Sequence, residues 1–181
     1  PSADSPYAQA TFEVGPGDDV MLKVALSPVN EMNARTNLKT EMPDWDFNAV
    51  REQALQAWDG ELGRVKATFR SDSERRTFYT SMYHFLYAPV VWCDVNGDYM
   101  GSDGRVRHGA SFCNYTTWSL WDTYRAAHPL ATLIMRDRLS DYAQSMMAIY
   151  REQGELPVWH LMSNETYCMV GISSVPILAD M

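Results

Sequence analysis

The sequence predicts a mainly α-helical protein with a small β portion near its start. Short runs rich in β-branched and apolar residues cover 11–14 and 20–26, and a turn-forming segment separates them. After Pro28 the pattern changes, and from Phe47 to Val65 apolar residues recur every three or four positions, which is the period of an amphipathic helix. Helix caps at Asp46, Ser71 and Ser140 and a helix stop at Gly154 mark further helices, so most of the chain should be helical.

The β portion is expected to be a hairpin. Its strands would be 11–14 and 20–26, joined by a turn in the Gly- and Asp-rich segment 15–19. Two strands cannot bury a core by themselves, so the hairpin should complete a sheet that begins upstream. The next stretch, 29–42, is mixed and polar and predicts a short helix that ends before Pro43.

Two longer helices should follow. Ser71 and Glu74 have the spacing of a capping box and predict the start of the second one. From 78 to 87 this second helix is apolar or aromatic nearly all round, which predicts burial between partners. The first helix should be capped by Asp46 and should lay one apolar stripe on a neighbour, formed by Phe47, Val50, Ala54, Trp58, Leu62 and Val65.

The second half of the chain should start with a turn and continue as helices. An Asn-Gly pair at 96–97 is a strong hairpin signal. Helical patterns resume near Leu120, with one helix over 129–136 and a second that is capped by Ser140 and runs over 140–153. The glycine that follows the second helix is a typical C-terminal cap.

Composition excludes several classes of protein. Apolar residues make up 46% of the 181 residues and charged residues 21%, so the chain is globular rather than disordered. The net charge of −8, without a basic cluster, counts against a nucleic-acid partner. No stretch approaches the roughly 18 consecutive apolar residues that a membrane span needs.

The ends and the cysteines give further expectations. Residues 1–6 lack the features of a signal peptide and 176–181 end on an apolar run, so we expect an internal fragment of a longer polypeptide. The three cysteines are widely spaced and contain no Cys-x-x-Cys pair. They predict neither a zinc site nor a disulfide framework.

The richest candidate for a binding site is the run 117–125. It brings Trp121, Asp122 and Arg125 within two helical turns. Aromatic faces beside convergent charged groups suit a sugar, whose C–H faces stack on rings while its hydroxyls bond to charged groups. A purely structural alternative is a helix end with a buried Trp and an Asp–Arg pair.

A second cluster of the same kind contains Trp159 and Glu165. These two residues would lie beside the first cluster if both segments reached the rim of the same binding site. The alternative is a packed Trp and a capping Glu.

Other motifs give weaker indications of function. Asp94, Asn96 and Asp98 imitate the start of an EF-hand loop, but Tyr99 replaces its glycine and Arg105 its final glutamate, so a polar hairpin is the better interpretation. The four histidines have no metal-ligand spacing and are interpreted as structural. No nucleophile elbow and no phosphate-binding glycine loop occurs.

Taken together, the chain resembles glycoside hydrolase family 92, the calcium-dependent exo-acting α-mannosidases. Four stretches carry the likeness in the family's order: 30–47, 76–84, 119–130 and 154–180. The resemblance covers nearly the whole chain, and the third and fourth stretches together are specific.

The resemblance implies a fold and an activity. Residues 1–29 would be the last strands of a β-sandwich, 30–66 a helical linker, and 67–181 the first helices of an (α/α)6 toroid. The parent protein would be a secreted or periplasmic hydrolase that removes terminal α-linked mannose from glycans with inversion, assisted by calcium. Its general acid, general base and calcium ligands would lie in later segments, so the chain itself would contain no catalytic or metal-binding residue and would depend on the rest of the parent polypeptide.

The resemblance also implies roles for the candidate residues. Asp122 would accept hydrogen bonds from mannose hydroxyls and Trp121 would shape the same wall. Arg125, Trp159 and Glu165 would support them. Two alternatives stay open: a non-catalytic carbohydrate-recognition or interaction module, and an α/α-toroid hydrolase of another sugar.

Overall fold

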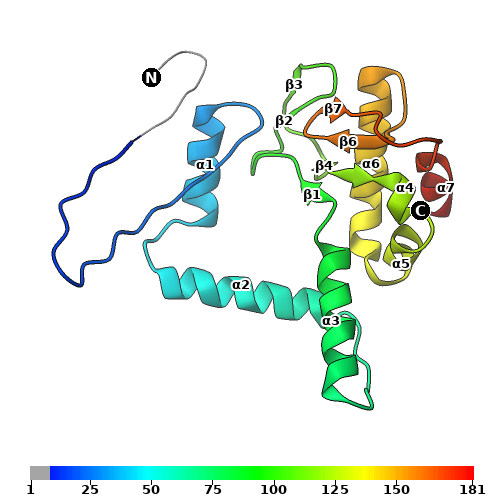
Figure 1. Ribbon diagram of the computed structural model, residues 1–181. Coiled ribbons are helices and arrows are strands. Elements are labelled where there is room, and N and C mark those ends of the chain that lie inside the picture. Colours follow the sequence, from blue (N-terminus) through cyan, green and yellow to red (C-terminus); the bar gives the residue numbers. More distant parts are fainter. Residues whose placement is uncertain (1–8) are drawn as a thin grey trace.

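The computed structural model describes residues 9–181 and is mainly helical, as predicted (Figure 1). Helices α1, α2 and α3 follow one another in the first half, with α2 crossing between the other two. The short strands and helices α4 to α7 gather into a second, denser body. Within residues 9–181 no helix combines the length and the apolar character needed to cross a membrane.

The predicted N-terminal hairpin forms its turn but not its strands. The Asp18 amide donates to the Gly15 carbonyl at 3.2 Å, which closes the turn. Segments 11–14 and 20–26 are extended without strand pairing, and Leu22 and Leu26 are 80% and 84% exposed. A strand needs a paired neighbour, and none of the described segments supplies one here. Residues 1–8, which include the segment interpreted as lacking a signal peptide, lie outside the described residues.

Helices α1 (Glu31–Glu41) and α2 (Phe47–Leu62) form where they were predicted. The side chain of Asn30 caps α1 by accepting from the Asn33 amide at 2.9 Å, and Asp46 caps α2 by accepting from the Ala49 amide at 2.9 Å. No residue of α2 is buried, so its apolar stripe is mostly uncovered by the described chain.

Helix α3 (Asp72–Leu86) begins at its predicted cap, since the Ser71 hydroxyl accepts from the Glu74 amide at 3.2 Å. The predicted burial of 78–87 is wrong: within α3 only Met82 is buried, and Tyr87 just beyond it is 65% exposed. The first turns of α3 project beyond the rest of the described chain (Figure 1), and its later turns are covered only in part, with Trp58 of α2 packed on Tyr83.

The strands form three small antiparallel sheets. At the predicted Asn-Gly turn, Gly97 has φ +82° and its amide donates to the Asp94 carbonyl at 2.8 Å. The strand after this turn pairs further along the chain and not back across the turn, so the hairpin is displaced. The pairs are β1 (Val90–Val91) with β4 (Tyr115–Thr116), β2 (Tyr99–Met100) with β3 (Val106–Arg107), and β6 (Trp159–Leu161) with both β5 (Trp118–Ser119) and β7 (Asn164–Glu165).

The C-terminal helices are α4 (Leu120–Thr123), α5 (Ala127–Ile134), α6 (Arg136–Gln153) and α7 (Ser174–Asp180). The predicted boundary at Ser140 is wrong: α6 starts four residues earlier, and the Ser140 hydroxyl accepts from Gln144 inside the helix. Gly154 ends α6 in the left-handed conformation at φ +86°, as its position predicted.

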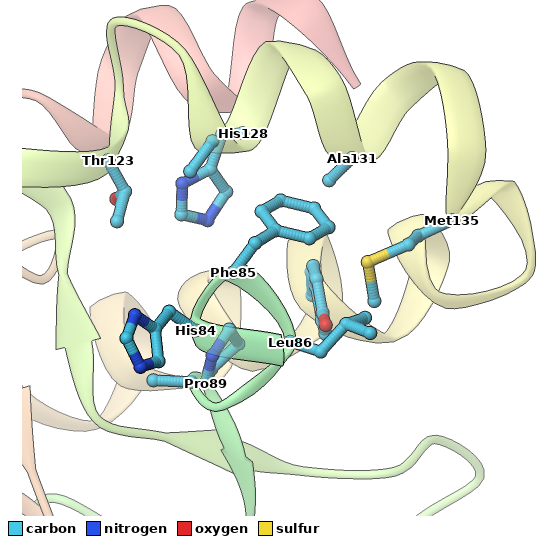
Figure 2. A pocket seen from close by; sticks show the side chains of 11 residues that line it. His84, Phe85, Leu86, Pro89, Thr123, His128, Ala131 and Met135 are labelled. Carbon is cyan, nitrogen blue, oxygen red and sulfur yellow. The ribbon is translucent and has the colours of Figure 1, made fainter. Parts of the chain in front are cut away.

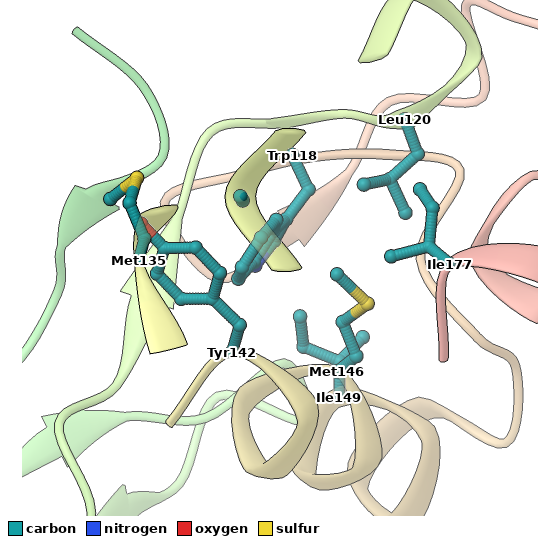
Figure 3. Close-up of a cluster of buried hydrophobic side chains, with 8 residues drawn as sticks. Trp118, Leu120, Met135, Tyr142, Met146, Ile149 and Ile177 are labelled. Atoms are coloured by element: carbon teal, nitrogen blue, oxygen red, sulfur yellow. The ribbon is translucent and has the colours of Figure 1, made fainter. Parts of the chain in front are cut away.

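The core lies where β5 and α4 meet α5, α6 and α7 (Figure 3). Trp118 and Leu120, 1% and 0% exposed, alternate into it from the β5–α4 junction. The residues between and after them, Ser119, Trp121 and Asp122, therefore lie toward the surface on a rigid support. The other members of the core are Ala131, Met135, Tyr142, Met146, Ile149 and Ile177.

Candidate functional site

The Trp121–Asp122 pair stands at the surface on α4. Trp121 is 37% exposed, and Asp122 is exposed as well. The Ser119 hydroxyl donates to one oxygen of the Asp122 carboxylate, which orients the side chain. Much of the accepting capacity of this carboxylate remains available to a ligand.

Arg125 supports the indole and leaves the carboxylate free. Its guanidinium lies over the Trp121 ring at 4.7 Å and over the Tyr124 ring at 4.5 Å. It also donates to the Trp121 carbonyl at 3.1 Å. This arrangement is a cation–π contact, and the Asp–Arg pair of the structural alternative does not form.

Sheet pairing brings the second predicted cluster to the first. Ser119 of β5 is opposite Trp159 of β6, and His160 of β6 is opposite Glu165 of β7. The indole of Trp159 is half-buried. Two segments that are forty residues apart therefore share one three-stranded sheet, which ends at the start of α4.

Glu165 is engaged with the backbone. One oxygen of its carboxylate accepts from the Trp159 and Tyr167 amides at 2.9 and 3.0 Å, and the other accepts from the Val158 amide at 2.9 Å. Tyr167 has a positive φ of 51°, a conformation that a non-glycine residue holds only when its surroundings fix it. The arrangement gives Glu165 the role of fixing the loop and the position of Trp159.

We expect Glu165→Gln to destabilise the protein by about 1–3 kcal/mol, because an amide offers only one acceptor oxygen where the carboxylate serves three amides with two. Urea denaturation of the full-length protein measures the loss. Glu13→Gln, at an exposed position, is the matched control. Equal midpoints for the two variants would contradict the assigned role.

A buried polar network that the sequence did not reveal ties α1 to the Asn-Gly turn. Asp94 accepts from Asn33 at 2.8 Å and from Asn37 at 2.7 Å, and all three side chains are buried. Hydrogen bonds from Asn33 and from the Gly109 amide lower the pKa of Asp98 to about 2. The two asparagines are four residues apart on one helix face, and this spacing together with the polar segment 94–98 is the signal that the sequence offered.

The same network also bears on the resemblance of segment 94–98 to a calcium-binding loop. The Asp94 and Asp98 oxygens accept from hydroxyl, amide and ring N–H donors, so they are already in use. Among residues 9–181 no group of three or more His, Cys, Asp or Glu side chains is arranged to hold a metal ion. Segment 94–98 therefore does not fit a calcium ion.

A small apolar cavity of about 180 Å³ lies beside α4 (Figure 2). Thr123 of α4, Phe85 and Met135 line it, together with His84 and His128. His128 is buried, and burial lowers its pKa to about 4, so its ring is neutral. None of the five predicted site residues lines this cavity.

Comparison with known proteins identifies the family. The model of the glycosyl hydrolase family 92 catalytic domain matches residues 33–181. The family GH92 α-mannosidase BT3965 of Bacteroides thetaiotaomicron is 39% identical with a TM-score of 0.79, over 86% of this chain and 21% of that one. The inverting GH92 mannosidase BT2199 of the same species is 32% identical with a TM-score of 0.78, over 84% and 21%.

A curated relative points the same way. An uncharacterized secreted glycosidase of Arthroderma benhamiae is 26% identical over 165 residues, which are 89% of this chain and 17% of that protein. The chain thus spans about a fifth of the length of these relatives. The matched domain model covers most of the chain, and the chain belongs to glycoside hydrolase family 92.

Proposed function

We propose that this chain forms one wall of the mannose-binding site of an exo-acting α-mannosidase that removes terminal α-linked mannose from glycans. One observation carries the proposal: in a family 92 chain, the surface pair Trp121–Asp122 is mounted on a core-anchored strand–helix junction. The solved relatives support it, since they are mannosidases and one of them was determined with mannoimidazole.

The geometry suits the recognition of a sugar. The Asp122 carboxylate retains acceptor sites for hydroxyl donors, and bonds of this charge-assisted kind are strong when water is excluded. Trp121, stiffened on one side by Arg125, offers a flat apolar surface beside it. Trp159 and Glu165 hold the adjoining edge through the β5–β6–β7 sheet.

The proposal assigns the bond-breaking chemistry to other parts of the protein. An inverting glycosidase needs a general acid and a general base about 6.5–9.5 Å apart, with room for water between them. Asp122 and Glu165 do not form such a pair in this proposal, because Glu165 is engaged with the backbone. The acid, the base and the ligands of any calcium ion are placed outside residues 1–181.

The same proposal includes the wider architecture and the compartment. Residues 67–181 would open an (α/α)6 toroid, 30–66 would link it to a β-sandwich, and 1–29 would end that sandwich. A secreted or periplasmic location is proposed because a curated relative is described as secreted.

The test is to assay the full-length protein on matched aryl α-mannosides, α-glucosides and α-galactosides. We expect turnover of the α-mannoside, with β-mannose as the first product seen by proton NMR because inversion changes the anomer. Preference for another sugar would assign the protein to a different substrate class. Mannoside binding by the isolated chain, with no turnover by the full-length protein, would indicate a recognition module.

A further inference from the structure

Two of the three cysteines face each other across the β1–β4 pair. Val91 is opposite Tyr115 in the register of these strands. Beyond the last paired residues the Trp92 amide donates to the Asn114 carbonyl at 2.7 Å, so the two segments stay side by side. The next opposed residues are Cys93 and Cys113, whose Sγ atoms are 3.7 Å apart.

This separation is close to what a covalent bond requires. A disulfide has an S–S distance of about 2.05 Å, and its Cβ atoms are about 3.5–4.5 Å apart, which directly opposed strand residues approach. Rotation of the two side chains would bring the sulfur atoms closer together. The third cysteine, Cys168, is not part of this pair: it is exposed and lies in the segment after β7.

The backbone is fixed on both sides of the pair. Next to Cys93, the Asp94 side chain is held by Asn33 and Asn37 of α1. Two residues after Cys113, the Tyr115 amide donates to the buried hydroxyl of Ser145 on α6 at 3.0 Å. The two thiols are therefore held near each other by structure that does not depend on a bond between them.

The pair also has the reactivity and the access that exchange chemistry needs. The hydrogen bond with Cys113 lowers the pKa of Cys93 to about 7, so much of this thiol is ionised near neutral pH, and the pKa of Cys113 is raised. Cys93 lines a groove of about 670 Å³ between 24–28 and β1, through which a small disulfide reagent can reach it.

From this geometry we propose that Cys93 and Cys113 form a cross-strand disulfide when the protein meets a low-molecular-weight disulfide such as oxidised glutathione. The Cys93 thiolate attacks one sulfur of the reagent, forms a mixed disulfide and releases one thiolate. Cys113 then loses its proton and attacks the Cys93 sulfur, which releases the second thiol. The two cysteines give up two electrons, and the reagent is reduced to two thiols.

The bond would enclose residues 94–112, the segment that carries the Asn-Gly turn and the β2–β3 pair. Closing such a loop restricts the unfolded chain, so the oxidised protein should be the more stable form. Inside this segment, the Ser102 hydroxyl lies 2.9 Å from Nε2 of His160 in β6, and the Met100 carbonyl accepts from Ser163 in the β6–β7 turn. Oxidation would therefore steady a loop in contact with the sheet that carries Trp159.

The test uses the reduced full-length protein, equilibrated with oxidised glutathione, blocked with N-ethylmaleimide and digested with trypsin. Cleavage after Arg105 and Arg107 places the two cysteines on separate peptides, 77–105 and 108–125. We expect mass spectrometry to find these peptides joined, and Cys168 to carry maleimide or glutathione. Free thiols at both positions, two separate glutathione adducts or a link to Cys168 would each overturn the proposal.

Variants add a matched control. Cys168→Ser should still yield the joined peptides, whereas Cys113→Ser should leave Cys93 open to maleimide or glutathione. The melting temperature of the wild-type protein should rise by several degrees on oxidation, and that of a Cys93→Ser variant should not. Since peptide mapping uses the wild-type protein, the result does not depend on how well any variant folds.

Discussion

Asp122→Asn in the full-length protein is expected to lower kcat/KM for an α-mannoside by on the order of 10²–10³-fold. The amide keeps the size of the carboxylate but loses its charge and half of its acceptor capacity. The neighbouring Ser119 hydroxyl can still donate to it, so the loop should keep its shape. Steady-state kinetics on an aryl α-mannoside, with circular dichroism to confirm folding, measure the effect.

The matched control is Asp59→Asn, an exposed aspartate on α2, which should leave kcat/KM unchanged. The affinity for mannose, the expected product, is a second measure, because Asp122→Asn should weaken the binding of mannose as well as turnover. If the two variants behave alike on both measures, Asp122 does not contact the sugar and the proposed wall is misplaced.

Local rules accounted for most of the elements that the sequence predicted correctly. The caps at Asp46 and Ser71 and the glycine stop at Gly154 all depend on hydrogen bonds within four residues. These signals are complete within a short window, so they do not need the rest of the protein.

Apart from the misplaced helix start at Ser140, the predictions that failed depend on distant partners. The apolar segment 20–26 has the composition of a strand, but a strand exists only through its neighbour. The aromatic face around Tyr83 and Tyr87 was predicted to be buried, yet the two side chains are 39% and 65% exposed. The described chain covers this face only in part, through Trp58 of α2, whose ring centroid is 4.7 Å from that of Tyr83.

The candidate site shows the same division. Trp121 and Asp122 could be selected from residue type and spacing alone, but the pairing of Ser119 with Trp159 is a contact across forty residues. Arg125 contacts the indole and not the carboxylate, and Glu165 accepts from backbone amides. Both facts follow only from the three-dimensional arrangement of the chain. Cys93 lies close to Cys113 because of the strand register, and the sequence contains no Cys-x-x-Cys pattern that would have predicted this contact.

Mild acid is expected to destabilise the protein through two buried histidines. His128 and His160 are 6% and 2% exposed, and burial lowers the pKa of each to about 4. Neither nitrogen of the His128 ring makes a hydrogen bond of normal geometry with the described residues, and the Thr123 backbone offsets only part of the cost of burial.

The direction follows from proton linkage. In the unfolded chain each imidazole titrates near its ordinary pKa of 6.5, so the unfolded state binds more protons over the range from 6.5 down to about 4. Stability is therefore complete above pH 6.5 and is lost as the pH falls through this window. Each histidine accounts for about 3 kcal/mol once the pH reaches the folded pKa value and below.

Urea midpoints of the full-length protein at pH 7, 6, 5 and 4 measure this loss, and His128→Phe isolates the share of one ring. Phenylalanine fills the apolar site beside Trp118 without a group to protonate, so the variant should lose less stability between pH 7 and 4 than the wild type. His84→Gln, at an exposed position, should retain the wild-type slope. A wild-type midpoint that stays constant across the window would show that neither buried ring is kept neutral by the fold, because a group with the same pKa in both states has no linkage to unfolding.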